Sequence, residues 1–345
     1  MIHVLALIIQ CIWDFFKHVT CPLPLCSTCV FSKNSYIREN IMFHLRMHPF
    51  LNTMRPVLQT LLSFSMSFFK PKGIRWNYES VLHKNTLLHF WHYSPFAADS
   101  IETPIIVCVP GINGHNQSHY VNQLVEFCRS QGIVCVVIDK QEIDMNSTWE
   151  LEVLVDLLTS HHLKIMILGV SAGGNTVCRF AASKNIPHNV KVCVSLSNGL
   201  DIAHVKESIK YPWAHVTMPL YKSYMIRKSC IPRKAFRAVK TIWDVNDVVY
   251  DYPDMSYYNK CSSHTALQNT RVPLVIISAL DDPFFDSSVL SHVHKAIEKN
   301  DMITLITTDY GGHMGWIQHG RSWIFDEVVK VISHVYEFSY TQASQ

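Results

Sequence analysis

Residues 164–183 read KIMILGVSAGGNTVCRFAAS, an apolar run that ends at a serine between glycines and continues into a segment with helical spacing. The run Ile165–Val170 is short and does not alternate, so it predicts a strand buried on both faces of a parallel sheet. Gly169 and Gly173 allow two backbones to pass close together at the turn that follows. The stretch therefore predicts a strand–turn–helix unit that holds the hydroxyl group of Ser171 clear of the sheet.

The same alternation of strand and helix continues over the chain from about residue 104. The segments expected as strands are Ile105–Val109, Ile133–Ile138, Val190–Leu196, Pro273–Ala279 and Ile303–Thr307. The segments expected as helices are 118–128, about 149–159 and 176–182. Strands and helices of these lengths form a parallel sheet covered on both faces, and right-handed crossovers bring the C-terminal ends of the strands to one edge. We therefore expect an α/β fold with a mostly parallel central sheet and a functional site at that edge.

Two regions depart from this alternation. The extension 1–70 holds apolar runs up to Trp13 and over Val57–Phe69, both shorter than the roughly 20 residues that span a bilayer. We expect them to be either short membrane anchors or helices packed on the main domain. The segment of about 198–264 is aromatic and has no strand pattern, and structureless loops of this length are rare. We therefore expect a main domain over 71–345 that carries this segment as a helical lid insertion.

The composition excludes several classes of protein. Of the 345 residues, 48% are apolar and 17% are charged, which excludes a disordered chain. The net charge of +3 and the absence of a basic stripe argue against a nucleic-acid partner. The low charge instead favours apolar contact, with a membrane surface or with a partner.

Nine of the eleven cysteines fall into two groups. Those within the regular part of the chain read as small buried residues of a protein in a reducing, intracellular compartment, namely Cys108, Cys128, Cys135, Cys178, Cys193 and Cys261. The segment CPLPLCSTC holds Cys21, Cys26 and Cys29, for which zinc binding, palmitoylation and no function at all stay open. A second pair of ligands at zinc spacing is not evident nearby, so we expect no metal and no cofactor.

An acid and a base follow Ser171 at the ends of other expected strands. VPLVIISALDDPFFD ends a strand at Asp281-Asp282, and ITLITTDYGGHMGW ends one at Gly-Gly-His313. A serine hydroxyl needs a base to become a nucleophile, and that base needs a carboxylate to orient it. We expect His313 to be the base. On spacing alone either aspartate can face it, and the other then caps the turn.

Oxyanion stabilisation requires backbone N–H groups near the nucleophile. Ala172 directly follows Ser171 and supplies one such group. The loop VPGINGH after the strand Ile105–Val109 supplies the second, which we assign to Ile112. The order serine, aspartate, histidine is the order found in α/β-hydrolases.

Four motifs together resemble one subfamily of α/β-hydrolases, the animal α/β-hydrolase-domain-containing proteins of types 1 to 3 with their plant and bacterial relatives. The motifs are PGINGHNQSHYV, LGVSAGGN, YYNKCSSHTALQNTRVPLVIISALDDPF and GGHMGW, within about residues 70–340. By position, the resemblance implies a catalytic triad of Ser171, Asp282 and His313. It also implies lipid esters, such as phospholipids and monoacylglycerols, as substrates, and a membrane anchor near the N-terminus. The family's Asn-x-Arg-Gly loop is replaced here by VVIDKQEIDMNSTW, so the resemblance leaves the substrate open.

We therefore expect a membrane-associated serine hydrolase that acts on a lipid ester through an acyl-enzyme on Ser171. The insertion around Tyr211–Ile231 is expected to line the acyl tunnel. One alternative is an acyltransferase with the same triad, although the chain has no His-x-x-x-x-Asp box. The other is a catalytically silent lipid- or steroid-binding protein of this fold. Asp244 and Asp247 look like a carboxylate pair for acid–base work, but we expect them to fix the fold of the insertion.

Overall fold

The computed structural model describes most of the main domain and parts of the remainder. The described residues are 28–34, 59, 60, 63, 74–95, 100–112, 114–140, 146–208, 226, 232–237, 239, 244, 247, 248, 255–318, 321, 322, 324, 325, 327 and 328. The expectations for the first apolar run, for Cys21 and Cys26, and for nearly all of Tyr211–Ile231 fall on residues outside this set.

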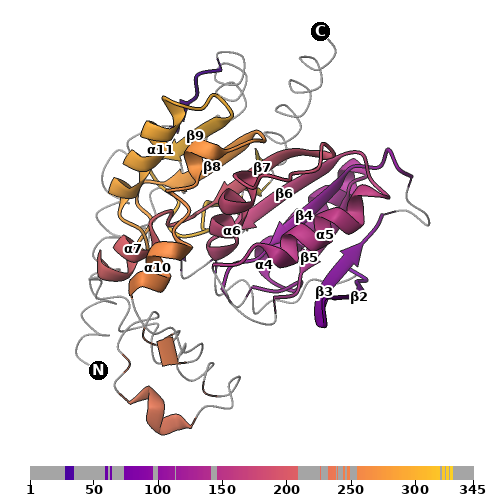
Figure 1. Cartoon of the computed structure of the whole chain (residues 1–345), viewed down its shortest axis with the longest axis horizontal. Coiled ribbons are helices and arrows are strands. Elements are labelled where there is room, and N and C mark those ends of the chain that lie inside the picture. The colour runs from indigo at the N-terminus through magenta and orange to yellow at the C-terminus, as the bar shows by residue number, and fades with distance from the viewer. Residues whose placement is uncertain are drawn as a thin grey trace.

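The core of the molecule is a nine-stranded sheet in the order β1-β9-β8-β7-β6-β4-β5-β3-β2 (Figure 1). Its strands are β1 (Thr28–Phe31), β2 (Asn77–His83), β3 (Thr86–Tyr93), β4 (Ile105–Val109), β5 (Val134–Ile138), β6 (Ile165–Val170), β7 (Val190–Leu196), β8 (Leu274–Ala279) and β9 (Ile303–Thr308). The six strands from β4 to β9 pair in parallel, and β1, β2 and β3 are antiparallel. A two-stranded ladder, β10 (Ile317–Gln318) with β11 (Arg321–Ser322), lies apart from it. The expected mostly parallel α/β architecture is therefore confirmed.

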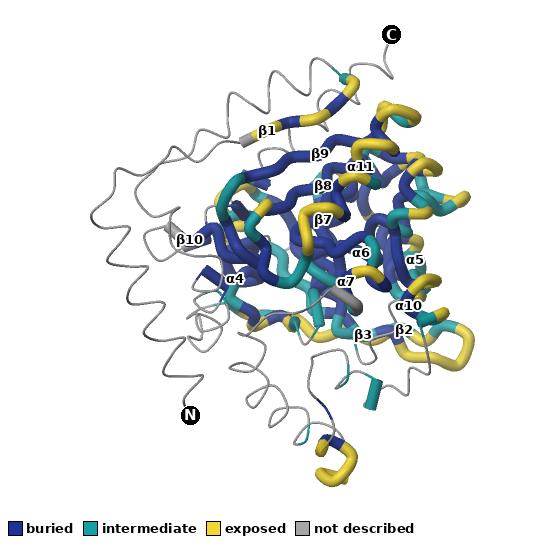
Figure 2. The backbone as a smooth tube through the Cα atoms, turned by 90° about the vertical axis from the view of Figure 1, so that its left-hand side faces the viewer, coloured by how far each residue is buried: buried dark blue, intermediate teal, exposed yellow. Residues whose placement is uncertain are grey.

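The central strands are apolar on both sides because each side faces its own core. In β4, Ile105, Val107 and Val109 belong to one apolar cluster, whereas Ile106 and Cys108 belong to the other. Every residue of β4, β5, β6, β8 and β9 is buried, and Figure 2 shows β8 and β9 as dark tubes in the interior. A continuous apolar run is therefore the signature of a strand covered on both faces.

Helices cover both faces of the sheet. The described helices are α4 (His119–Gln131), α5 (Trp149–Thr159), α6 (Ala172–Ala181), α7 (Ile202–Ser208), α10 (Met255–Cys261) and α11 (Leu290–Ile297), with 3-10 turns η1 (Arg233–Phe236), η2 (Leu267–Asn269) and η3 (Ser287–Val289). The buried residues of α5, α6 and α11 join one core, and those of α4 join the other. Helix α4 ends where Gly132 takes a left-handed conformation at φ 65° and donates its N–H to the carbonyl of Cys128.

Three strands extend the sheet beyond the expected ones. β2 and β3 form a hairpin at one edge, and their turn places Lys84 and Asn85 at positive φ, as a two-residue turn of this kind requires. At the opposite edge β1 pairs antiparallel with β9, with Cys29 opposite Thr307. The extension 1–70 therefore contributes a strand to the main sheet, and the division at residue 70 stays a prediction.

The two ends of the insertion are fixed to the main domain. α7 and α10 lie side by side (Figure 1), and Asp247 joins them by an ion pair of 2.6 Å with Lys206 and a hydrogen bond from the hydroxyl of Tyr258. Asn175 of α6 donates to the carbonyl of Cys261 at 2.7 Å. Asp247 thus has the structural role expected of it, and α10 is attached to the helix that follows Ser171.

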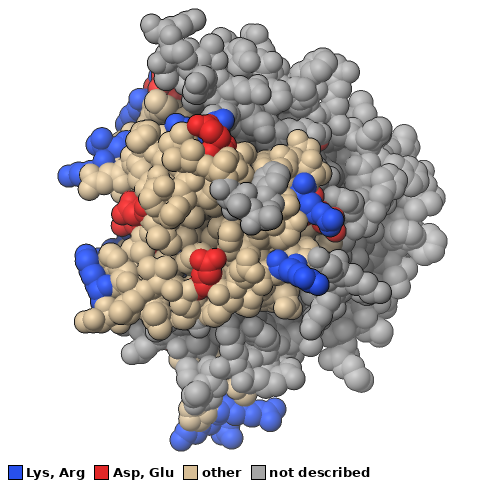
Figure 3. Space-filling model, turned by 90° about the vertical axis from the view of Figure 1, so that its right-hand side faces the viewer, with Lys and Arg blue, Asp and Glu red and all other residues tan. Residues whose placement is uncertain are grey.

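The surface of the described residues is weakly charged. On the side of the molecule shown in Figure 3, most of the described charged side chains stand apart from one another among uncharged ones, whereas a group of basic side chains gathers at the lower end. Three large apolar side chains of the β2–β3 hairpin, Tyr78, Leu82 and Leu87, are exposed. Within the described part of the chain, none of the helices has the length and apolar character needed to cross a membrane.

Candidate active site

Ser171 lies on a sharp turn between β6 and α6. Its backbone has φ 55° and ψ −120°, a conformation that costs free energy for any residue with a side chain. Its N–H donates to the carbonyl of Leu196 at the end of the neighbouring strand β7, with a distance of 2.8 Å. The turn therefore fixes the serine at the C-terminal edge of the sheet, where the alternation of strands and helices predicts a site.

The glycines around Ser171 are needed because the turn is packed against its neighbours. A Cβ atom added to Gly173 would lie 2.0 Å from the carbonyl oxygen of Val109, and one added to Gly169 would lie 2.3 Å from the carbonyl oxygen of Gly173. Both distances are far shorter than any real contact, and both are to backbone atoms. The Gly-x-Ser-x-Gly pattern is therefore explained by close approach of three backbone segments.

The serine begins a chain of hydrogen bonds through His313 to Asp282. The Ser171 Oγ and His313 Nε2 atoms are 3.0 Å apart, and the His313 Nδ1 and Asp282 Oδ2 atoms are 2.8 Å apart. His313 and Asp282 are both buried, with 4% and 6% of their surface exposed. The three side chains come from turns after β6, β8 and β9, so the structure brings together residues up to 142 positions apart in the sequence.

The two neighbouring aspartates have different contacts. Asp282 faces the imidazole, and its other oxygen accepts the N–H of Phe284 at 2.8 Å. Asp281 instead accepts the N–H of Gly312 at 2.8 Å, which fastens the turn that carries His313. The structure thus gives the two aspartates different partners, although their spacing in the sequence did not indicate which of them faces His313.

Asp281 lies next to the hydrogen-bonded chain of Ser171, His313 and Asp282, and its carboxyl group has a raised pKa. Burial, together with the nearby charge of Asp282, raises the pKa of its carboxyl to about 7, against the opposing effect of hydrogen bonds from Gly312 and Gly311. The rings of Phe284 and Phe285 pack on the imidazole of His313, with centroids at 4.5 and 5.1 Å. These rings shield the pair of His313 and Asp282 from water, which strengthens their electrostatic interaction.

The two residues expected to form an oxyanion hole flank Ser171. Ala172 is the first residue of α6, and a helix has no internal acceptor for its first N–H groups. A Cβ atom added to Gly111 would lie 3.0 Å from the Cβ and 3.5 Å from the Oγ of Ser171, so the loop that carries Ile112 lies directly against the serine. The arrangement has the parts that acyl transfer requires.

No motif in the sequence predicts a set of contacts made by Gln59, Thr60 and Ser63. The N–H of His313 donates to the hydroxyl of Thr60 at 2.8 Å, and the N–H of Ile317 donates to Gln59 Oε1 at 2.9 Å. The hydroxyl of Ser63 donates to the carbonyl of Met314 at 2.8 Å. The loop of His313 is therefore held from one side by Asp281 and from the other by a segment about 250 residues earlier in the chain.

Comparison with known proteins gives relatives that are distant in sequence. No family model matches the chain. Monoacylglycerol lipase ABHD2 of Danio rerio is 22% identical over 254 residues, 63% of this chain and 59% of the relative. Phospholipase ABHD3 of Mus musculus is 21% identical over 253 residues, which cover 65% of this chain and 61% of the relative. The putative esterase YheT of Escherichia coli (strain K12) is 25% identical over 269 residues, which cover 68% of this chain and 77% of the relative. The chain thus spans about 60% of the length of the two ABHD relatives.

Solved structures agree with the architecture. A fungal esterase from Rhizomucor miehei has a TM-score of 0.59 and 14% identity, covering 90% of this chain and 98% of its own. The esterase Pf2001 of Pyrococcus furiosus has a TM-score of 0.52 and 13% identity, covering 75% and 91%. At these identities the likeness establishes a shared fold.

Proposed function

We propose that the chain is a serine hydrolase that cleaves carboxylic esters of lipids, a proposal supported by its distant similarity to the ABHD relatives and by the fold that it shares with solved esterases. The observation that carries the proposal is the hydrogen-bonded chain from Ser171 through His313 to Asp282 at a strained turn. Strain is retained in folded proteins mainly where function requires it.

In the first half of the proposed reaction, Ser171 Oγ attacks the carbonyl carbon of the ester. His313 Nε2 takes the serine proton as the C–O bond forms, and then gives it to the oxygen of the leaving alcohol. Asp282 holds the Nδ1 proton of the imidazole and stabilises the imidazolium ion. The products of this half are a free alcohol and an acyl group esterified to Ser171.

In the second half, water replaces the alcohol. His313 removes a proton from the water, which attacks the acyl carbon and releases a fatty acid, and the proton returns to Ser171. In both halves the N–H groups of Ala172 and Ile112 donate to the oxygen that becomes negatively charged. A donor of this kind contributes about 3 kcal/mol to transition-state stabilisation.

A lipid ester is supported as the substrate by the names of the relatives, which are a monoacylglycerol lipase and a phospholipase. We further propose that the enzyme works at an intracellular membrane surface. The exposed side chains of Tyr78, Leu82 and Leu87 on one hairpin supply apolar contact area for such a surface. The six described cysteines of the main domain are buried and unbonded, which fits a reducing compartment.

The test is labelling of the full chain by a fluorophosphonate probe, which reacts with a hydroxyl activated as Ser171 would be. The unmutated chain and Asp281→Asn should label, because the amide oxygen of the variant still accepts the N–H of Gly312. Ser171→Ala and His313→Ala should not label. Labelling of Ser171→Ala at the unmutated rate would refute the assignment of the nucleophile.

A separate, unlabelled sample of the same chain is then given a lipid ester in water with and without glycerol. Release of free fatty acid in both conditions supports hydrolysis. Acylated glycerol as the main product would replace hydrolysis by acyl transfer on the same residues. A folded chain that binds lipid but neither labels nor turns over would be the silent binding protein instead.

A further inference from the structure

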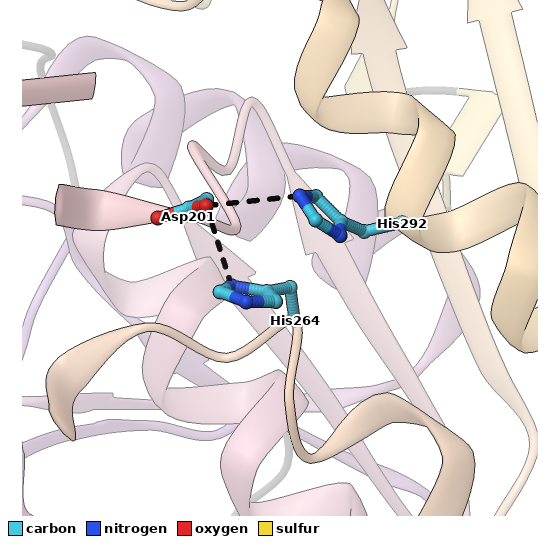
Figure 4. Close-up of side chains that lie close together, drawn as sticks. All are labelled: Asp201, His264 and His292. Carbon is cyan, nitrogen blue, oxygen red and sulfur yellow. Dashed lines mark ion pairs between the residues drawn. The ribbon is translucent and has the colours of Figure 1, made fainter. Parts of the chain in front are cut away.

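Two histidines and one aspartate converge at the base of the insertion, apart from the hydrogen-bonded chain of Ser171. Asp201 precedes α7 at the start of the insertion, His264 follows α10 at its end, and His292 lies on α11 of the main domain. Figure 4 shows the two imidazoles directed toward the same carboxylate. Three segments that are separate in the sequence thus present metal-ligating atoms to one point.

The distances suit a metal ion better than direct bonds between the side chains. Asp201 Oδ2 lies 3.6 Å from His292 Nε2 and 3.9 Å from His264 Nδ1, both too long for hydrogen bonds. One ligand atom of each residue lies within 4.8 Å of the others. Ligands about 2.0–2.2 Å from a tetrahedral zinc ion lie roughly 3.4 Å from one another. Small side-chain movements therefore bring all three atoms to bonding distance.

One of the ligand atoms in the cluster has no other bonding partner in the described part of the chain. Among the described residues, His264 Nδ1 is buried and has no hydrogen-bond partner, although a buried ring nitrogen normally has one. The second oxygen of Asp201 accepts the backbone N–H of His204 at 3.1 Å and the hydroxyl of Ser262 at 3.5 Å. Outer contacts of this kind orient a carboxylate ligand and leave its other oxygen directed at the ion.

An ion pair between Asp201 and protonated histidines is the competing explanation. Burial lowers the pKa of His292, and the facing imidazole of His264, with Lys295 and His204, lowers it further, while Asp201 opposes them. The two imidazole rings lie 4.4 Å apart, so protonating both would place like charges together. A neutral imidazole is the form that binds a metal.

We propose that Asp201, His264 and His292 bind one divalent transition-metal ion, of which Zn²⁺ is the best match to two imidazoles and a carboxylate. Three protein ligands leave the fourth tetrahedral position to water. The bound ion joins both ends of the insertion to α11 and so fixes the base of the lid relative to the sheet.

The experiment measures Zn²⁺ binding to the full chain by calorimetry after removal of metal with EDTA. The unmutated protein should bind one ion that is lost in His292→Gln and weakened in Asp201→Asn and His264→Gln. Each change should reduce the affinity by more than the roughly 10–100-fold that loss of an outer contact costs. His294→Gln is the matched control, because His294 is an exposed histidine on the same helix that contacts Phe31. It should bind as the unmutated chain does.

Two further readouts separate this site from the other histidines and cysteines of the chain. Zn²⁺ in excess should raise the melting temperature of the unmutated protein and of His294→Gln, but not that of His292→Gln. Co²⁺ should give the visible absorption of a four-coordinate nitrogen–oxygen site in the same two proteins only. Equal Zn²⁺ affinity in all variants, or no binding to the unmutated protein, would overturn the proposal. Neither readout depends on ester hydrolysis, so the result stands apart from the catalytic assignment.

Discussion

From the hydrogen bond between the N–H of His313 and the hydroxyl of Thr60, we predict that substitution of Thr60 lowers activity. Thr60 is buried and accepts the backbone N–H of His313 at 2.8 Å. Thr60→Val keeps the shape of the side chain and removes the acceptor, which leaves a buried N–H without its partner. We expect the variant to fold but to hold His313, the proposed catalytic base, less firmly in line with Ser171.

The magnitude follows from the cost of an unpaired buried donor. Leaving such a group unsatisfied costs about 1–3 kcal/mol, and each 1.4 kcal/mol changes an equilibrium constant tenfold. If the loop of His313 moves to recover a bond with water, the fraction of molecules with an aligned histidine falls by this factor. We therefore expect kcat to fall about tenfold with little change in KM, since the histidine acts on the chemical step.

The assay is hydrolysis of a short p-nitrophenyl ester, with kcat and KM measured beside the melting temperature. Thr60→Ser is the matched control because it keeps the hydroxyl group and removes only a methyl group. Ser63→Ala removes a donor to the carbonyl of Met314 and should have a smaller effect, because that bond is only partly buried. A chain that begins at residue 71 loses both contacts and should be less active than any of the point variants.

The outcome that would refute this reasoning is equality of Thr60→Val and Thr60→Ser in both kcat and melting temperature. Full activity in the chain that begins at residue 71 would refute it as well. The latter result would support a catalytic domain that is independent of residues 1–70.

Three further predictions concern the turns around the triad. The raised pKa of Asp281 means that its ionised form is disfavoured in the fold, so its stabilising contribution is complete below about pH 4 and is lost as the pH rises through about 7. Asp281→Asn should therefore raise the melting temperature relative to the unmutated chain at pH 8 and not at pH 4, and an equal change at both pH values would contradict this. Asp282→Asn should leave stability nearly unchanged at pH 8 and reduce kcat by about 10⁴-fold, measured on the same ester, because the amide favours the wrong imidazole tautomer. Gly173→Ala should lower both activity and melting temperature, because the added Cβ would lie 2.0 Å from the Val109 carbonyl oxygen. Gly174→Ala should lower them less in thermal denaturation and ester assays, because its closest contact, at 2.7 Å, is the movable hydroxyl of Ser195, and its other contacts lie at 3.1 Å or more.

Buried strands could be located from the sequence because both of their faces are apolar. The bounds of β4, β6 and β7 agree with the expected segments residue for residue, and α5 begins and ends where the pattern places it. α6, by contrast, begins at Ala172, four residues before the expected start, because Gly173 and Gly174 are held in the first turn by packing rather than by helix propensity. Continuous apolar runs are thus a better guide than propensity at a crowded turn.

Edge strands and distant contacts could not be found in the same way. β2 has mostly exposed residues and lies at the edge of the sheet, so its sequence carries no apolar run. The contact of Thr60 with His313 joins residues 253 positions apart and depends on no local motif. The approach of Asp201, His264 and His292 is likewise a property of the folded chain alone.

The placement of β1 and Thr60 against the last part of the sheet has a consequence for synthesis on the ribosome. Both are made before the central strands, whereas their partners in β9 and the loop of His313 are made after them. Contacts between such distant residues form slowly, because a long loop must close first. The N-terminal segment must therefore stay unpaired while the central strands assemble, and the histidine loop is completed after the rest of the sheet. We expect esterase activity to be the last property that the newly made chain acquires.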